Sequence, residues 1–209
     1  MRGESETMKT VVVTGGIGSG KSEFCRLLGQ KGIPVYDSDF RAKSLYDEQP
    51  GLVDDMEDSL GCSLRADDGS LDKAKLASAI FSDASKMQKV EDIVHPAVLE
   101  DFRRWKAFAP SEAPFVVFES AIVLEKQLFN GIRDYVVLVD APPEVRLRRA
   151  CLRDGSSPEK VLERMSRQHF DLSLVDRIVR NDSDLEHLAS QAEELFVYLT
   201  DKLPSNKLS

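Results

Sequence analysis

The sequence predicts an α/β fold, a parallel sheet enclosed by helices in three layers, and three observations carry this prediction. Five short β-branched runs stand out, helical patterns lie between them, and a glycine-rich loop follows the first run. Four of the five runs are apolar nearly throughout, which is typical of strands covered on both faces. Because strands alternate with helices, right-handed crossovers should join parallel strands. We expect strands at residues 10–14, 33–36, 115–118, 135–139 and 177–180.

Apolar residues spaced three and four apart mark the helices between these strands. Phe24, Leu27 and Leu28 predict a helix directly after the glycine-rich loop. A longer apolar stripe predicts a C-terminal helix and runs through Leu185, Leu188, Ala192, Leu195 and Leu199.

Between the second and third strands, residues 40–114 form a stretch that is too long for a simple crossover. We expect a helical insertion over the carboxyl edge of the sheet. Residues 87–105 have a helical pattern, but Pro96 should interrupt it, because a proline disfavours helical angles at the preceding residue, here His95. The acidic run at residues 54–58 is typical of a solvated surface.

The composition argues against several classes of protein. The 209 residues are 42% hydrophobic and 31% charged, which is ordinary for a globular protein. The net charge of −8 argues against a general nucleic-acid binder. No apolar run approaches the roughly 18 residues that a membrane helix needs. Cys25, Cys62 and Cys151 lie far apart without a CxxC pair, which is typical of reduced thiols and predicts a cytoplasmic protein.

The glycine-rich loop has the spacing Gly15-x-x-x-x-Gly20-Lys21-Ser22. Glycines let the backbone curl so that several N–H groups converge on a phosphate, and a helix N-terminus adds unpaired donors. Lys21 would reach the β- and γ-phosphates of a nucleotide, and Ser22 would offer its hydroxyl to Mg²⁺. The strand before the loop and the helix after it match the context of a P-loop, so the sequence predicts an ATP site rather than a glycine-rich turn without a ligand.

Three acidic residues should lie at the carboxyl edge of the sheet, close to this loop. Asp37 and Asp39 directly follow the second strand, and Glu119 ends the third. An aspartate in that place could accept a proton from a substrate hydroxyl, act through a Mg²⁺-bound water, or cap the next helix. Glu119 has the position of an acid that supports Mg²⁺, and equally that of a surface glutamate at the end of a strand.

A basic segment follows the fourth strand and predicts two helices separated by a break at residues 155–158. A helical hairpin rich in arginine is typical of a lid that closes over transferred phosphates and excludes water, because the guanidinium fork matches phosphate oxygens. The alternative is a solvated charged face. The arginines that we assign to this predicted lid are Arg146, Arg149, Arg153, Arg164 and Arg167.

Taken together and in order, these motifs resemble the dephospho-CoA kinase family from Lys9 onward. The resemblance is carried by an ordered set of segments and not by any one of them. The segments are TGGIGSGKS at 14–22, GIPVYDSD at 32–39, His95-Pro96, ESAIVLE at 119–125, VDAPPEVRLRR at 139–149 followed by Arg153, and Arg164-Met165 with Gln168.

The resemblance implies an enzyme that transfers the γ-phosphoryl group of ATP to the ribose 3′-hydroxyl of dephospho-CoA. The products are CoA and ADP, in the last step of CoA synthesis. Asp39 matches the presumed base, with Lys21 and Arg149 as further catalytic residues, and Ser22 and Glu119 would hold Mg²⁺. Asp37, Asp39 and His95 would bind the acceptor. The nucleotide would contact Gly16, Ile17, Gly18, Ser19, Gly20, Lys21, Ser22, Glu23 and Asn181.

Family architecture further implies a five-stranded core, a helical substrate domain and a lid. The expected nucleotide-binding core combines residues 8–40, 114–143 and 170–203. The helical CoA-substrate domain is expected at 41–113 and the lid at 144–169. Residues 1–7 should be a disordered leader and not a signal peptide. We expect a monomer or small homo-oligomer without nucleic-acid or membrane partners.

The chain also departs from the family pattern. Glu23 stands where the family usually has threonine, and Ala121 where it usually has proline. The stretch 169–176 looks shortened and lacks a lysine, although Asn181-Asp182 does match. Two alternatives therefore stay open: another small-molecule P-loop kinase, for a nucleoside monophosphate or a sugar acid, and a nucleotide-binding switch without turnover. The insertion with His95 favours dephospho-CoA.

Overall fold

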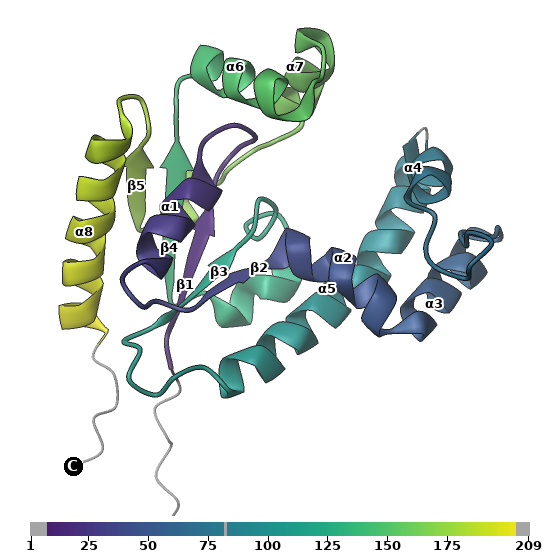
Figure 1. Ribbon diagram of the computed structural model, residues 1–209, viewed down its shortest axis with the longest axis horizontal. Helices are drawn as coiled ribbons and strands as arrows, with labels where there is room; N and C mark the ends of the chain where they lie inside the picture. The colour runs from purple at the N-terminus through teal and green to yellow at the C-terminus, as the bar shows by residue number, and fades with distance from the viewer. Residues whose placement is uncertain (1–7, 82, 204–209) are drawn as a thin grey trace, which may run out of the picture. The chain divides into compact units, whose positions relative to one another are not determined.

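The structure is a computed structural model that describes residues 8–81 and 83–203. These residues form a five-stranded sheet in the order β2-β3-β1-β4-β5, in which every pairing is parallel (Figure 1). The predicted α/β fold with a parallel sheet is confirmed. The leader expected at residues 1–7 lies outside the described residues. The strands are β1 (Thr10–Thr14), β2 (Val35–Asp37), β3 (Val116–Glu119), β4 (Tyr135–Asp140) and β5 (Arg177–Arg180).

The chain divides into two compact units. One unit contains the whole sheet and combines the chain up to Asp37 with the chain from Phe108 onward. The other unit is helical and spans residues 38–107. The functional roles given to the predicted domains stay predictions.

In the sheet unit, one face of the sheet packs against α1 (Lys21–Gly29) and α8 (Leu185–Lys202). Side chains that alternate along the strands meet the apolar stripes of both helices in one buried cluster, because successive strand residues point to opposite faces. Val11 and Val13 from β1 and Phe24 from α1 are fully buried there. Two 3₁₀ helices, Gln127–Ile132 and Leu172–Leu174, complete the connections. None of the described helices is both long enough and apolar enough to span a bilayer.

The register of the strands decides what meets at the carboxyl edge. Asp37 pairs with Glu119 across β2 and β3, and Glu119 pairs with Val13 across β3 and β1. The chain then leaves β1 after Thr14 and enters the glycine-rich loop. The two acids of β2 and β3 therefore end in line with the start of the loop.

The stretch after Gln168, which departs from the family pattern, leads into β5 without disturbing it. Asp176 accepts a hydrogen bond from the Val136 N–H at 2.8 Å and donates its own N–H to the Val136 carbonyl at 3.0 Å. These two bonds fix β5 beside β4 just before the paired residues begin.

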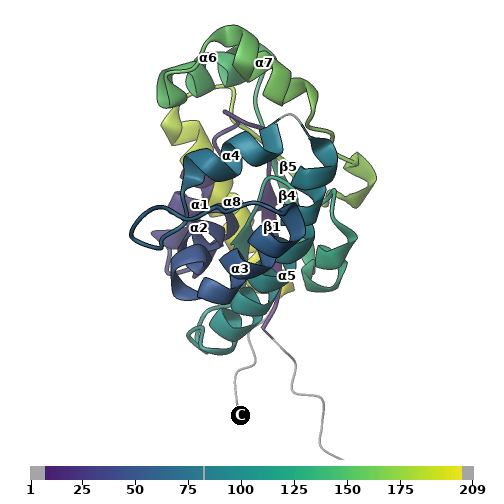
Figure 2. The ribbon, with the colours of Figure 1, turned by 90° about the vertical axis from the view of Figure 1, so that its right-hand side faces the viewer.

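A helical hairpin follows β4 in the same unit and corresponds to the predicted lid helices. It consists of α6 (Pro143–Asp154) and α7 (Pro158–Ser166), which lie together in both ribbon views (Figures 1 and 2). Gly155 ends α6 in the left-handed region with φ of 59°, which glycine adopts without strain. Ser157 and Pro158 then begin α7, since proline suits the first helical position.

The helical unit contains α2 (Ser38–Glu48), α3 (Pro50–Leu60), α4 (Lys73–Phe81) and α5 (Ala84–Ala107). The predicted interruption at Pro96 is wrong: α5 continues through this residue, and His95 keeps its helical place. A proline inside a helix removes one backbone hydrogen bond, but Val94, Val98 and Phe102 on the same helix are buried, and burial of this kind outweighs local propensity. Tertiary packing therefore decided what the local sequence could not.

A bidentate ion pair also ties α2 to α5 within this unit. Arg41 donates to both carboxylate oxygens of Asp101, at 2.9 and 3.1 Å, and also to both oxygens of Glu48. Hydrogen bonds to these two acids raise the pKa of Arg41, with Asp101 as the larger cause. The pair fixes the start of α2, the helix that carries Asp39.

Candidate active site

The glycine-rich loop has a backbone geometry that favours glycine. Gly18 and Gly20 have φ of 75° and 93°, in the left-handed region. A Cβ atom at Gly18 would collide with the Arg146 carbonyl oxygen, and one at Gly20 would collide with the Asn181 side-chain amide. The two glycines therefore allow the turn of the loop, and they also allow Arg146 of α6 and Asn181 after β5 to approach it closely.

The loop runs directly into α1, whose first residue is Lys21. Gly20 occupies the cap position, and no side chain among the described residues caps this helix. The first N–H groups of an α-helix have no partner inside the helix. The N-terminus of α1 therefore presents backbone donors and the positive end of the helix dipole, which favour an anion.

A small charged cluster lies where α1 begins and β3 ends. Ser22 donates a hydrogen bond from its Oγ to Glu119 Oε1 at 2.5 Å, and Lys21 Nζ lies 3.7 Å from the same oxygen. Glu119 is only 5% exposed. Burial is the largest cause that raises the pKa of Glu119; the Ser22 hydroxyl and then Lys21 oppose it, and the charge of Asp37 adds to it.

Cys25 belongs to this cluster as well, three residues after Ser22 on the same face of α1. Its thiol is hydrogen bonded to the Glu119 carboxylate, and the residue is 1% exposed. Burial and then the Glu119 charge raise the pKa of this thiol well above its usual value. Cys25 therefore stays a protonated donor, a role that its prediction as a reduced thiol did not include.

The donor set fits a magnesium ion. Ser22 and Glu119 offer a hydroxyl and a carboxylate oxygen side by side, and Mg²⁺ prefers oxygen ligands. Among the described residues, no group of three or more His, Cys, Asp or Glu side chains could hold a metal alone. Mg²⁺ in nucleotide sites usually takes one or two protein ligands and completes its shell with phosphate and water.

Two lid arginines reach the loop region. Arg146 donates from Nε to the Ile17 carbonyl oxygen at 3.1 Å and from Nη2 to Gln168 Oε1 at 3.3 Å. Arg149 donates to the carbonyl oxygen of Asn181 at 3.1 Å and to its Oδ1 at 3.4 Å. Asn181 in turn donates from Nδ2 to the Ser19 carbonyl oxygen at 2.8 Å, so the predicted Arg149 and Asn181 do meet beside the loop.

Three further arginines of the hairpin pair with acids of the hairpin itself. Arg153 and Arg164 both pair with Asp154, and Arg167 pairs with Glu163. These side chains are more than half exposed. The helical spacing of Arg146, Arg149 and Arg153 places them along one side of α6, but it does not predict which of them contacts the loop. The sequence therefore predicted Arg146 only as one of several lid arginines, with Arg149 chosen as the catalytic one, and gave Gln168 no role in the site.

A cavity of about 230 Å³ lies beside the loop. It continues from the loop toward the start of α8 and combines polar groups with apolar side chains. Its lining residues are Gly20, Glu23, Arg149, Asn181, Ser183, Asp184, Leu185 and Leu188.

The remaining predicted site residues divide between the two units. Asp37 ends β2 beside Glu119, as the register shows. Asp39 is exposed and lies inside the first turn of α2, so it is not the cap of that helix. His95 is half-buried on α5. Asp39 and His95 both belong to the helical unit.

Comparison with known proteins gives the family. The sequence profile of the dephospho-CoA kinase family matches residues 9–187. The dephospho-CoA kinase of Porphyromonas gingivalis is 43% identical over 167 residues, which cover 80% of this chain and 81% of that protein. The dephospho-CoA kinase of Bacteroides fragilis strain YCH46 is 34% identical over 194 residues, which cover 91% and 93%.

Solved structures share the fold. TT1252 from Thermus thermophilus superposes with a TM-score of 0.78 at 30% identity, over 93% of this chain and 100% of that one. The dephospho-CoA kinase from Campylobacter jejuni shares the fold, with a TM-score of 0.59 at 19% identity over 91% and 97%. The profile match covers the loop, the acids of the sheet edge, the insertion and the lid, and the chain belongs to the dephospho-CoA kinase family.

Proposed function

We propose that this protein transfers the γ-phosphoryl group of ATP to the ribose 3′-hydroxyl of dephospho-CoA and releases CoA and ADP. One observation carries the proposal: in a chain of this family, Lys21, Ser22 and Glu119 converge where the P-loop enters α1. Phosphoryl transfer requires little covalent chemistry from the protein, so positioning and charge stabilisation account for most of the catalysis.

The loop holds the phosphates of ATP. The N–H groups at the start of α1 and the Lys21 ammonium face a triphosphate whose charge they stabilise. Ser19 supports this assignment, because its buried Oγ has no hydrogen-bond partner among the described residues. The cavity lined by Arg149 and Asn181 continues from the loop and has the place of the adenosine part of ATP.

Ser22 and Glu119 would hold Mg²⁺, which neutralises charge on the phosphates when it is bound. The raised pKa of Glu119 suits this role, since a buried carboxylate without a cation is costly and a cation restores the charged form. Arg149 would stabilise the charge of the transferring group, and the lid around it would exclude water.

The acceptor side of the site is assigned to the acids of the DSD triplet and to the helical unit. Asp39 orients or deprotonates the 3′-hydroxyl, and Asp37 assists in binding the substrate. His95 contacts dephospho-CoA from α5. We further propose a cytoplasmic enzyme that acts as a monomer or small homo-oligomer.

An ADP-release assay with several acceptors tests the function. The purified chain is incubated with ATP, Mg²⁺ and either dephospho-CoA, adenosine, AMP or shikimate. We expect ADP only with dephospho-CoA, together with a product that carries a 3′-phosphate by mass spectrometry and NMR. ADP with AMP or shikimate instead would assign the chain to another small-molecule kinase. No ADP with any acceptor, despite ATP binding, would favour a nucleotide-dependent switch.

A further inference from the structure

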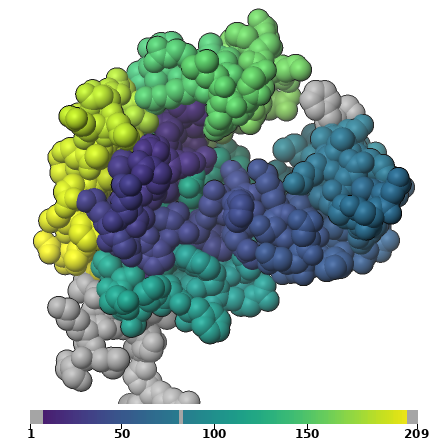
Figure 3. Space-filling model, viewed as in Figure 1, coloured from purple at the N-terminus to yellow at the C-terminus, as the bar shows by residue number. Residues whose placement is uncertain are grey.

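The tip of the phosphate loop is also part of the lid. Ile17 is 8% exposed, and its side chain packs in a small core with Ala150 from α6 and Val161 from α7, both fully buried. The half-buried residues around this core all belong to the hairpin as well: Leu147, Cys151 and Met165. Figure 3 shows the hairpin in green directly against the N-terminal segment in purple. Without Ile17, the two lid helices would enclose a gap.

The backbone of Ile17 is bound to the lid at both of its polar groups. Its N–H donates to Gln168 Oε1 at 2.8 Å, and its carbonyl oxygen accepts from Arg146 Nε at 3.1 Å. Gln168 Oε1 also accepts from Arg146 Nη2 at 3.3 Å, so the three residues form a closed set. One amide oxygen thus holds the loop and the arginine together.

The surroundings of this set are tight. A Cβ atom at Gly16 would collide with the Arg146 guanidinium, and one at Gly18 would collide with the Arg146 backbone. The Arg146 guanidinium is partly buried where it bonds Ile17 and Gln168, so it depends on these acceptors, and burial lowers its pKa. The Ile17 N–H is already bound to Gln168 and is therefore not a donor for phosphate in this arrangement.

We propose that Ile17, Arg146 and Gln168 are positioning residues that join the phosphate loop and the base of the lid into one preassembled element. The Ile17 amide serves this connection, and the phosphates are left to the later amides of the loop and to Lys21. Gln168 then sets the conformation in which the loop receives ATP, although it does not touch the nucleotide. The lid does not move as a flap independent of the loop. This inference rests on the proposed ATP site.

The consequence differs from that of a free lid. In a free lid, a change at its base alters turnover but leaves ATP binding without acceptor unchanged, because the loop alone would bind the phosphates. In a preassembled element, the same change loosens the loop before any acceptor is present. ATP affinity and the order of α6 and α7 should therefore change together.

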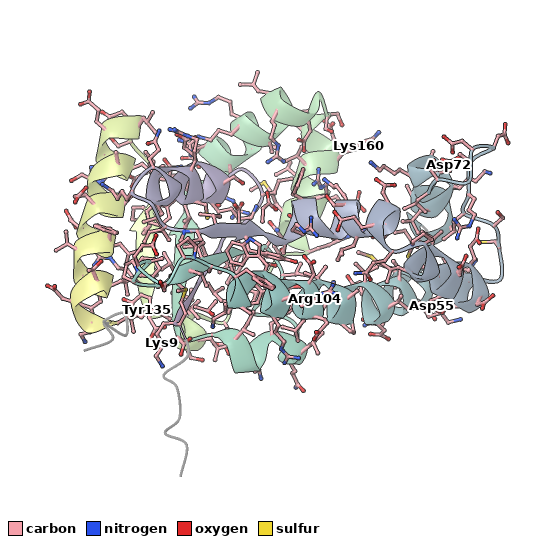
Figure 4. All side chains as sticks on the ribbon, turned by 60° about the horizontal axis from the view of Figure 1, so that its bottom comes forward. Lys9, Asp55, Asp72, Arg104, Tyr135 and Lys160 are labelled. Carbon is pink, nitrogen blue, oxygen red and sulfur yellow. The ribbon has the colours of Figure 1, made fainter. Side chains whose placement is uncertain are left out.

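The test compares Gln168→Leu with Gln168→Glu and with Lys160→Ala. Leucine keeps the volume but removes the acceptor, whereas glutamate keeps an oxygen for both Ile17 and Arg146. Lys160 projects from the surface of α7 and is a matched lid control (Figure 4). The readouts are the ATP dissociation constant by calorimetry, without acceptor, and amide hydrogen exchange of residues 143–166 in the ATP-free protein.

We expect Gln168→Leu to weaken ATP binding about tenfold, as for the loss of one hydrogen bond that leaves a buried donor unpaired. Exchange in α6 and α7 should rise in the same variant. Gln168→Glu and Lys160→Ala should stay within about twofold of the wild type in affinity. Ile17→Val, which shortens the side chain but keeps the backbone bonds, should show a smaller loss in the same direction.

The inference is overturned if Gln168→Leu binds ATP as the wild type does, or if its affinity falls while exchange in the lid is unchanged. Thermal unfolding of each variant shows whether it is folded, and an unfolded Gln168→Leu leaves Ile17→Val to decide by the same two readouts. Failure of the wild type to bind ATP would overturn the proposed function itself. A wild type that binds ATP beside variants that bind equally well would overturn only the connection between loop and lid.

Discussion

Two acidic residues of the sheet unit, Glu119 and Asp154, have pKa values that are shifted in opposite directions. Glu119 is buried at the end of β3, and burial raises its pKa although Ser22 and Lys21 lie beside it. Asp154 lies at the exposed end of α6, and hydrogen bonds from Arg153 and then Arg164 lower its pKa to about 2. The neighbours of Asp154 stabilise its charged form, whereas burial destabilises the charged form of Glu119. A buried acid whose surroundings disfavour its charge is more typical of a functional site than of a structural ion pair.

The largest expected effect concerns Asp39, an acid that is exposed like Asp154 and to which the proposed function gives the role of base. Asp39→Asn should lower turnover about 10²–10⁴-fold, the range for removal of a positioned general base, with the ATP dissociation constant nearly unchanged. Steady-state kinetics with dephospho-CoA and calorimetry with ATP measure the two quantities. Turnover equal to the wild type would refute the assignment of Asp39. Asp39 would then have no more of a catalytic role than Asp154, which only forms ion pairs.

Lys21→Ala removes the cation beside Glu119 and should have the next largest effect. Loss of one preorganised charge from a phosphate site costs about 2.7–4 kcal/mol of transition-state stabilisation, which is roughly 10²–10³ in kcat/KM. The pKa of Glu119 should rise further, because Lys21 is one of the groups that lower it. Lys160→Ala in the lid is the matched control for loss of a lysine. Activity retained in Lys21→Ala would contradict the ATP site as described.

The same comparison shows how far the sequence alone reaches. The P-loop and the strand β1 were predicted at their observed residues, because a spacing motif and an apolar β-branched run are local signals. The continuation of α5 through Pro96 was not, because it depends on burial within the helical unit. The bond between Ile17 and Gln168 joins residues 151 positions apart, and no local pattern announces such a pair. The catalytic and binding roles of the site residues stay predictions.

Gly20→Ala tests the close approach that the buried part of the site requires. Alanine at φ of 93° is strained, and its Cβ would collide with the Asn181 amide that bonds Ser19. We expect a loss of about 1–3 kcal/mol in stability and weaker ATP binding. Gly131→Ala is the control, since a Cβ there meets no atom within 4 Å and its φ is ordinary. Equal melting temperatures for the two variants would argue against the described loop geometry.

Glu119→Gln sharpens the contrast with Asp154 through its dependence on pH. A raised folded-state pKa means that the stabilising contribution of the protonated acid is present below the unfolded value of 4.5 and is lost as the pH rises through the folded value. The neutral amide keeps that contribution at pH 7. Without Mg²⁺ and ATP, the free energy of unfolding of the variant should therefore equal that of the wild type or exceed it by at most about 1 kcal/mol. Its activity and its response to Mg²⁺ should fall. If the stability difference between Glu119→Gln and the wild type grew as the pH fell, the pKa of Glu119 would be lowered and not raised in the folded protein.

Asp154→Asn should have the smallest effect and the opposite dependence on pH. The pKa of Asp154 is lowered to about 2, so its contribution is present above the unfolded value of 3.8 and is lost as the pH falls from 3.8 toward 2. Because the residue is exposed and its partners are more than half exposed, solvent screening limits this contribution to less than about 1 kcal/mol. Thermal unfolding at pH 7 in low and high salt measures it, and the small loss should shrink in high salt. A loss of several kcal/mol would mean that the lid hairpin depends on the ion pairs of Asp154 for its fold. The exposed Asp154 would then matter to the structure as much as a buried acid does.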